Sequence, residues 1–281
     1  QIVVSHGKRN KLSPMTESPE FLYQVDGDLV IPTPLTGGPW DPEIQHGGPI
    51  SGILAHLVET IKTPSPMRTC RHTVELMRGV PIRPLQWTTE VIREGRRLQV
   101  IQTSLHDQGK EVVRSTSVRL RVTEESNPVD EERMSHEEDE IPPFPNIATQ
   151  LTTPGVGIPA FLRAVEIRLP REASWAGTPG LMWIRLTKPL VEGVQTSPFV
   201  SMATVSDMLS MVAQYLDPKE WMTPNVDLTI SSFKDPAGEW IGLRGVHKNS
   251  KDGIGLSDAV LYDRDGRVGR GLATILIDSR Q

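Results

Sequence analysis

The chain has 281 residues and a formal net charge of -5, which disfavours nucleic acid as a partner because phosphate binding needs concentrated Lys and Arg. Hydrophobic residues make up 37% of the sequence, enough for a substantial core, while 24 prolines and 23 glycines favour short elements over long helices. The single cysteine, Cys70, excludes a disulfide framework and a multi-cysteine metal site.

Targeting signals are absent from the printed sequence. No apolar run approaches the length of about 18 residues that a membrane span needs. The first residues do not show a basic region followed by an apolar one, as a secretory signal would. We therefore expect a soluble, cytoplasmic protein with no membrane partner, no metal and no cofactor.

The first half of the chain predicts one helix followed by four strands. The glycine-rich segment 47–49 precedes an apolar stretch, 50–61, whose large residues recur at helical spacing. Strand-like segments follow at 69–77, 86–93, 98–105 and 112–122, and the last two are joined by a hairpin turn at 107–110.

The middle of the chain is acidic and rich in proline from 123 to 145. Such a segment buries little apolar surface and is typical of a solvated linker. We predict that an exposed linker at 123–159 separates an N-terminal unit at 1–122 from a C-terminal unit at 160–281.

The second half repeats the order of the first. The pattern predicts a strand at 181–186, a long apolar helix at 199–216, and strands at 226–233, 240–247, 254–262 and 268–277. A hairpin turn at 263–266 matches the one in the first half. The sequence therefore predicts an α+β fold with an internal duplication, in which each repeat packs one helix against an antiparallel sheet.

Asp207 lies within the apolar segment 199–216, where a carboxylate is costly to bury without a partner. A carboxylate in such surroundings is suited to act as a general base or acid near neutral pH. We therefore predict a catalytic role for Asp207 and a substrate contact for Ser210. The alternative is that Asp207, Ser210 and Gln214 simply form the narrow polar face of the helix.

Several segments resemble the thioesterase-like superfamily, and in particular the acyl-CoA thioesterases of the thioesterase II type. The likeness begins in segments 34–42 and 45–49 and continues through 74–78, 93–97, 206–208, 225–229 and 263–276. The resemblance implies a double hotdog fold, in which each of two repeats has a central helix wrapped by an antiparallel sheet. It also implies hydrolysis of an acyl-CoA thioester without a metal or a covalent cofactor.

In such enzymes an Asp activates water, helped by a hydroxyl group and a Gln. Asp207 matches the Asp position, and the hydroxyl position falls at or near Asn225 and Thr229. The Gln position falls at Ala273 or Thr274, and neither residue is Gln, although Thr274 remains a candidate substrate contact.

The segment before the first predicted helix supplies further candidates. The backbone N–H groups of Gly47 and Gly48 would lie at a helix start, where they can hold the thioester carbonyl oxygen. The preceding His46 could donate to the substrate or titrate, or it could simply pack. Arg96 and Arg97, in a predicted turn, could contact the phosphates of CoA or be merely solvated.

Three functions stay open at this point. The first is hydrolysis of an acyl thioester by water that Asp207 activates. The second, motivated by the missing Gln, is a redirected enzyme of secondary metabolism, a dehydratase, isomerase or cyclase acting on a polyketide or terpenoid intermediate. The third is a non-catalytic carrier of acyl groups or small molecules. A homodimer is an open alternative to a monomer.

Overall fold

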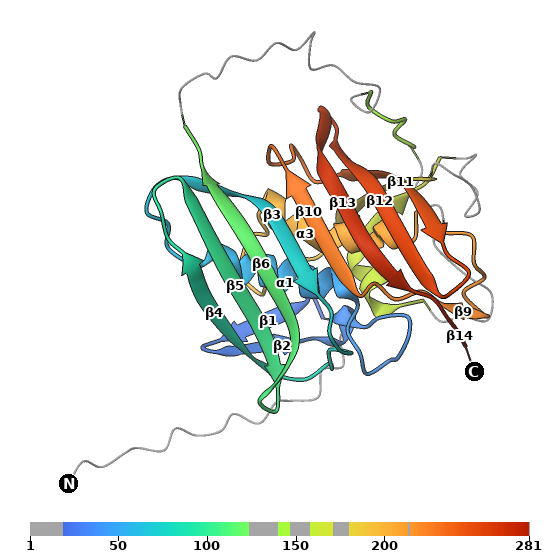
Figure 1. Ribbon diagram of the computed structural model, residues 1–281, viewed down its shortest axis with the longest axis horizontal. Helices are drawn as coiled ribbons and strands as arrows, with labels where there is room; N and C mark the ends of the chain where they lie inside the picture. Colours follow the sequence, from blue (N-terminus) through green and yellow to red (C-terminus); the bar gives the residue numbers. More distant parts are fainter. Residues whose placement is uncertain (1–18, 124–139, 147–157, 171–179, 213, 281) are drawn as a thin grey trace.

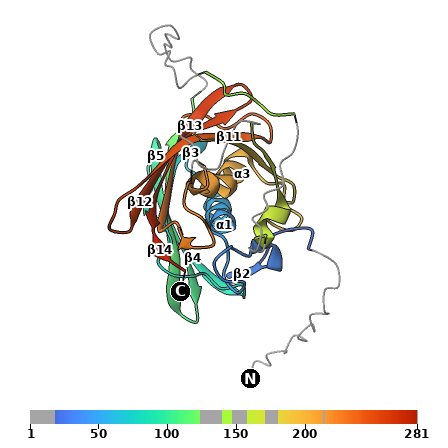
Figure 2. The ribbon, with the colours of Figure 1, turned by 90° about the vertical axis from the view of Figure 1, so that its right-hand side faces the viewer.

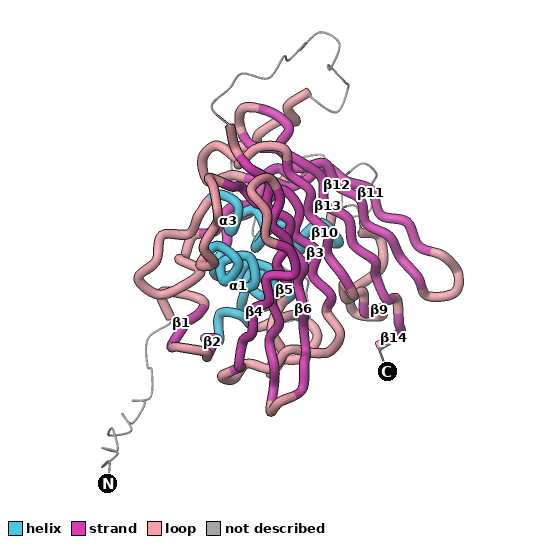
Figure 3. The backbone as a smooth tube through the Cα atoms, turned by 60° about the vertical axis from the view of Figure 1, so that its left-hand side comes forward, coloured by secondary structure: helices cyan, strands magenta, loops and turns pink. Residues whose placement is uncertain are grey.

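The computed structural model describes residues 19–123, 140–146, 158–170, 180–212 and 214–280. Its main feature is one antiparallel sheet of 12 strands that curves around two helices, as the end-on view in Figure 2 shows. The helices are α1 (Gly47–Glu59) and α3 (Pro198–Val205), and both lie on the concave side of the sheet (Figure 3).

The two halves of the chain contribute six strands each to this sheet (Figure 1). The first half supplies β1 (Tyr23–Asp26), β2 (Leu29–Pro32), β3 (Met67–Glu75), β4 (Leu85–Arg93), β5 (Leu98–Asp107) and β6 (Lys110–Arg121). The second half supplies β7 (Val165–Arg168), β8 (Gly180–Leu186), β10 (Asp227–Ser232), β11 (Ile241–Asn249), β12 (Ile254–Asp263) and β13 (Gly266–Leu276).

The strand order shows the internal duplication. It runs β1-β2-β4-β5-β6-β3 in the first half and, in the reverse sense, β10-β13-β12-β11-β8-β7 in the second. The halves join where β3 pairs with β10, with Thr73 opposite Thr229. This junction leaves neither central strand with a free edge, and it confirms the predicted α+β architecture of two like repeats.

The predicted elements agree with the observed ones except in the second helix and the shortest strands. The predicted helix at 199–216 ends earlier, because α3 stops at Val205 and continues as a 3-10 helix, η4 (Ser206–Ser210). The Thr204 hydroxyl donates to Val200 O at 2.7 Å within the last turn, a local bond that competes with regular helix geometry. The four-residue strands β1, β2 and β7 are too short to give a clear sequence pattern.

Close contact between α1 and α3 depends on glycine. A Cβ atom at Gly52 would lie 2.1 Å from Thr204 Oγ1, and one at Gly48 would lie 2.5 Å from Thr204 O. The two helices therefore pack backbone against backbone. Apolar side chains of the helices and of the concave face of the sheet fill the rest of the core, including Ile53, Leu54, Val74, Val205, Leu228 and Ile230.

Part of the predicted linker docks on the convex face of the second half. Trp183 Nε1 donates to Pro143 O at 2.9 Å, and the Phe144 ring contacts the rings of Trp183 and Trp240 with centroid distances of 5.3 and 5.1 Å. Four of the seven residues in this piece, 140–146, are exposed, whereas Phe144 is half-buried against its aromatic partners. Most of the remaining linker lies outside the described residues, and the unit boundaries stay a prediction.

Two shorter features complete the fold. A separate two-stranded sheet pairs β9 (Trp221–Met222) with β14 (Asp278–Ser279), bringing the last described residues back to the segment that follows η4. Among the helices that the structure describes, none is long and apolar enough to cross a membrane.

Candidate functional site

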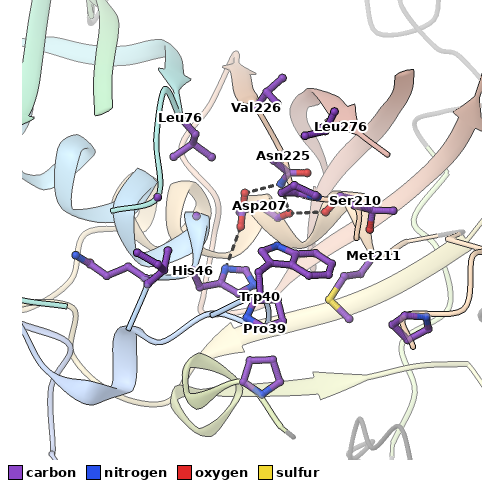
Figure 4. A pocket seen from close by; sticks show the side chains of 18 of the residues that line it. Pro39, Trp40, His46, Leu76, Asp207, Ser210, Met211, Asn225, Val226 and Leu276 are labelled. Atoms are coloured by element: carbon purple, nitrogen blue, oxygen red, sulfur yellow. Dashed lines mark hydrogen bonds and ion pairs between the residues drawn. The ribbon is translucent and has the colours of Figure 1, made fainter. Parts of the chain in front are cut away.

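A cavity of ≈ 760 Å³ opens between the N-terminal end of α1 and the η4 turn. The first half contributes His46 and Gly47 to its wall, and the second half contributes Asp207, Ser210 and Asn225. Much of the remaining wall is apolar. Figure 4 labels Pro39, Trp40, Leu76, Met211 and Leu276 of this wall, and the wall also includes Ile44, Ile50 and Leu162. An apolar cavity with a few convergent polar groups is the usual form of a small-molecule site.

Asp207 is the best-connected polar group of the cavity. Its side chain is buried, with the residue 4% exposed, yet both carboxylate oxygens have partners. Asn225 Nδ2 donates to Oδ1 at 2.6 Å, and His46 Nδ1 lies 3.0 Å from Oδ2 (Figure 4). The Asp207 backbone carbonyl accepts from Asn225 Nδ2 at 3.1 Å and from Ser210 Oγ at 3.3 Å. The carboxylate is therefore fixed in orientation by groups from both halves of the chain.

One polar side-chain atom of Asn225 has no hydrogen-bond partner among the described residues. Its Nδ2 is occupied by Asp207, whereas its Oδ1 is buried and has no hydrogen-bond partner among the described residues. A buried acceptor without a donor is uncommon in folded proteins and is often a sign of function. Because Asn225 also lines the cavity, its Oδ1 can accept a hydrogen bond from a molecule bound beside Asp207.

Gly47 is the residue that lets the carboxylate approach α1. A Cβ atom there would lie 2.6 Å from Asp207 Oδ1 and 2.8 Å from Oδ2, closer than any side chain tolerates. Gly47 is also the first residue of the helix, where a backbone N–H has no intrahelical acceptor. Its N–H can therefore donate to a ligand next to the carboxylate.

Gly48, also predicted to hold the carbonyl oxygen, is placed differently. Its N–H donates to His46 Nδ1 at 3.1 Å, which makes His46 the N-cap of α1. Gly48 is buried against Thr204 and is not among the described residues that line the cavity. The helix-start donor that reaches the cavity is thus Gly47.

His46 Nδ1 joins the start of α1 to the Asp207 carboxylate. It lies 3.1 Å from Gly48 N and 3.0 Å from Asp207 Oδ2. A ring nitrogen that accepts from Gly48 N–H cannot donate to Asp207 at the same time. One atom of His46 thus serves both the helix cap and the carboxylate.

The loop that carries His46 is anchored by a buried tyrosine. Tyr23 Oη donates to Gln45 Oε1 at 2.6 Å, and Gln45 Nε2 donates to Pro81 O at 2.8 Å. Complete burial raises the pKa of Tyr23 well above its ordinary value, so its hydroxyl keeps the proton that it donates. The His46 backbone N–H is itself held by Thr36 O at 2.7 Å.

Thr229 and Thr274 lie away from this group. Thr229 alternates with the buried Leu228 and Ile230, so its side chain points to the convex face, where Oγ1 donates to Thr73 Oγ1 at 3.2 Å. Thr274 likewise lies on the convex side of β13, where its Oγ1 donates to Asp227 Oδ2 at 3.1 Å. Neither is among the described residues that line the cavity.

Arg96 and Arg97 are also far from the cavity. They occupy the turn between β4 and β5, where Arg96 O accepts from Ser65 Oγ at 2.9 Å and Arg97 O accepts from Arg121 N at 3.1 Å. Ser65 follows the C-terminal end of α1, and the 13 residues of that helix span about 20 Å. The two arginines therefore lie at the end of α1 opposite Gly47.

Two arginines that the sequence did not single out do line the cavity, namely Arg78 and Arg280. Arg78 ends segment 74–78, which carries part of the resemblance without giving this residue a role, and no motif includes Arg280. Among the residues that the structure describes, no group of three or more His, Cys, Asp or Glu side chains could hold a metal ion.

Two family models match the chain. The model described as the acyl-CoA thioesterase N-terminal domain matches residues 36–120, and the one described as the acyl-CoA thioesterase C-terminal domain matches residues 137–274. The second match includes Asp207 and Asn225, and the first includes His46 and Gly47. No curated protein matches the chain.

Solved structures with the same fold include a conserved hot dog protein of unknown function from Alicyclobacillus acidocaldarius. It is 13% identical, with a TM-score of 0.69 over 92% of this chain and 96% of that one. The acyl-CoA thioesterase II TesB2 from Mycobacterium marinum is 15% identical, with a TM-score of 0.63 over 92% and 94% of the two chains. At such identities the likeness establishes the fold, which is the double hotdog.

Proposed function

The chain belongs to the acyl-CoA thioesterase family, whose two domain models together match more than half of it, and on this premise we propose that it hydrolyses an acyl-CoA thioester with a water molecule activated by Asp207. The observation that carries the proposal is the buried Asp207 carboxylate at the cavity wall, held by Asn225 and His46. A carboxylate that is fixed in this way is ready to accept a proton without first reorganising.

Asn225 would orient the attacking water. A water molecule beside Asp207 can donate one hydrogen bond to the carboxylate and a second to Asn225 Oδ1, which has no other described donor. Its lone pair is then directed away from both groups and toward the substrate. This role would replace that of the amide missing at Ala273 and Thr274.

Gly47 would hold the thioester carbonyl oxygen. Its N–H lies at the start of α1, where the helix dipole also favours negative charge. A donor of this kind stabilises the developing oxyanion by about 3 kcal/mol. Since Gly47 also lies directly against Asp207, the carbonyl carbon would sit next to the activated water.

The chemical steps then balance. The water oxygen bonds to the carbonyl carbon while its proton passes to Asp207, and the C–S bond of the tetrahedral intermediate breaks. The departing thiolate takes the proton back from Asp207. The products are a carboxylic acid and a free thiol.

The experiment that tests this function measures thiol release from short, medium and long acyl-CoAs. Asp207→Asn should lower kcat by about 10²- to 10⁴-fold, as expected for loss of a general base, while acyl-CoA still binds. Asp265→Asn removes the same charge from an exposed turn and serves as the matched control. Turnover by Asp207→Asn at the rate of the control would rule out the proposed role of Asp207.

The contact between His46 and Asp207 favours a second candidate, dehydration of a 3-hydroxyacyl thioester. In that reaction one group of the pair removes a C2 proton and the other protonates the C3 hydroxyl, which leaves as water, so the thioester stays intact. An imidazole and a carboxylate 3.0 Å apart beside an apolar cavity can perform both transfers. Mass spectrometry separates the candidates: dehydration removes one water from the acyl chain, whereas hydrolysis releases thiol.

A further inference from the structure

Arg280 lies in the cavity wall on the side of the two-stranded sheet. Its guanidinium carbon is 5.3 Å from the centroid of the Trp40 ring, and its backbone N–H donates to Glu220 O at 2.8 Å. The pairing of β14 with β9 holds the residues directly before it. The side chain is therefore positioned both by its backbone and by an aromatic face.

The Nε atom of Arg280 is buried and has no hydrogen-bond partner among the described residues. A buried N–H donor is normally satisfied in a folded protein. The two carboxylates of the cavity wall, Asp207 and Asp217, do not meet this need. His46 and Asn225 contact Asp207, and Asp217 Oδ1 accepts from Lys219 N at 2.9 Å. No ion pair of the described residues includes Arg280.

A second cation lines the same cavity from the first half of the chain. Arg78 follows β3, is exposed, and lies next in sequence to Leu76 and Met77, which also line the wall. Two arginines in a largely apolar cavity attract an anion, since charge interactions strengthen where water is partly excluded. The guanidinium fork is well matched to the paired oxygens of a carboxylate or phosphate.

We infer that Arg280, seated on Trp40 and joined by Arg78, binds an anionic group of the substrate. This inference rests on the proposed function and adds to it the requirement of a charged group beside the reacting thioester. The anion has two sources: a phosphate of the CoA moiety or a carboxylate on the acyl chain. Arg96 and Arg97, at the opposite end of α1, do not contribute.

The test compares three thioethers, which cannot be hydrolysed. S-octyl-pantetheine carries no anion, S-octyl-CoA adds the phosphates, and S-(7-carboxyheptyl)-pantetheine adds a carboxylate to the chain. Binding of each to the full chain is measured by calorimetry for the wild type, Arg280→Ala, Arg280→Lys and the control Arg96→Ala. The control removes the same charge from an exposed turn far from the cavity.

Arg280→Ala should weaken binding of one or both anionic thioethers by about tenfold, the effect of losing one charge-assisted hydrogen bond. The affinity of Arg280→Ala for the neutral thioether should equal that of the wild type. For the anionic thioethers, the affinity of Arg280→Lys should lie between those of the wild type and Arg280→Ala. Arg96→Ala should bind all three thioethers as tightly as the wild type. The sensitive probe identifies the source of the anion. Its affinity should also fall as salt is added.

The inference is overturned if Arg280→Ala weakens all three probes by the same factor, if it weakens none, or if the wild type binds neither anionic probe more tightly than the neutral one. Its failure is distinguishable from that of the proposed function because the probes report binding alone. Charge-selective loss without thiol release from acyl-CoAs would uphold the anion site and reject the hydrolase. Thiol release from acyl-CoAs without a charge-selective loss of binding would uphold the hydrolase and reject the anion site.

Discussion

His46 and Asp207 meet across the two halves of the duplicated chain, with His46 Nδ1 3.0 Å from Asp207 Oδ2. The other end of the helix pair shows the same arrangement, since Ser197 caps α3 and its Oγ donates to Glu59 Oε1 at 2.8 Å. In both places the N-cap side chain of one helix contacts a carboxylate at the C-terminal end of the other helix or just beyond it. The duplication therefore gives a contact between an N-cap and a carboxylate at both ends of the helix pair. Of the two carboxylates, only Asp207 is buried and lines the apolar cavity.

His46→Asn separates helix capping from acid–base chemistry. Asparagine is a good N-cap, and its amide can still donate to Asp207, but it cannot transfer a proton at neutral pH. If His46 only positions Asp207 during hydrolysis, kcat should fall by less than about tenfold. A fall of about a hundredfold or more in thiol release, with the thermal midpoint unchanged, would show that His46 itself transfers a proton during hydrolysis.

Gly47→Ala should damage the site, whereas Gly52→Ala should damage the packing. A Cβ at position 47 displaces the Asp207 carboxylate, and one at position 52 collides with Thr204 Oγ1. We expect Gly47→Ala to lose at least about 90% of kcat with little change in the thermal midpoint. Gly52→Ala should lower the free energy of unfolding by about 1–3 kcal/mol, because the added methyl group overpacks the helix contact. The thermal midpoint should then fall by several degrees.

The measurement is a melting curve and a thiol-release assay on the same two variants. Equal effects of the two substitutions on melting and on kcat would contradict this division of roles between neighbouring positions of one helix.

Acid should destabilise the protein through His72. Burial is the main cause that lowers the pKa of His72 from 6.5 to about 4, only partly offset by its bond to Ser51 O. Between these values the unfolded chain binds a proton that the folded chain does not, so stability falls as pH falls. The loss should reach about 2 kcal/mol by pH 5 and roughly 3 kcal/mol below pH 4.

Urea unfolding at pH 7 and pH 5 measures this loss. His72→Gln keeps hydrogen-bonding groups near Ser117 and Ser51 but cannot be charged, so its stability should change less between the two pH values. A change as large as that of the wild type would show that other groups cause the acid sensitivity.

Phe144→Ala should weaken the second half of the fold without touching the cavity. The ring contacts Trp183 and Trp240, and the guanidinium carbons of Arg168 and Arg264 lie 5.1 and 3.7 Å from its centroid. Loss of these contacts should reduce the free energy of unfolding by about 1–3 kcal/mol with kcat unchanged. The control is Phe233→Ala, since Phe233 is 61% exposed. Equal destabilisation by both variants in urea would contradict a docking role for Phe144.

The sequence predicted the repeats well because each depends on local signals, namely helical spacing in 50–61, alternating strands and the glycine turns near Gly109 and Gly266. Asp207 was recognisable because a charge in an apolar segment is unusual. The sequence could not choose between Asn225 and Thr229 for the hydroxyl position, because a shift of one residue moves a strand side chain to the other face of the sheet. In the structure Asn225 contacts Asp207, whereas Thr229 points to the convex face.

Other features depend on contacts between distant segments and leave no local signal. The contact of Arg280 with Trp40 exists only because β14 returns to pair with β9. The docking of Phe144 is concealed in an acidic, proline-rich segment that is typical of a linker. The 3-10 turn that presents Asp207 interrupts what is, by spacing alone, a continuous helix.

The central claim is that Asp207 activates water and does not itself attack the thioester. A single turnover with enzyme in excess over acyl-CoA, in water enriched in ¹⁸O, tests it most directly. The account predicts one ¹⁸O atom in each molecule of the released acid and none in the peptide that contains Asp207. Unlabelled acid with ¹⁸O in the Asp207 carboxylate would show an acyl-enzyme anhydride and would contradict the account.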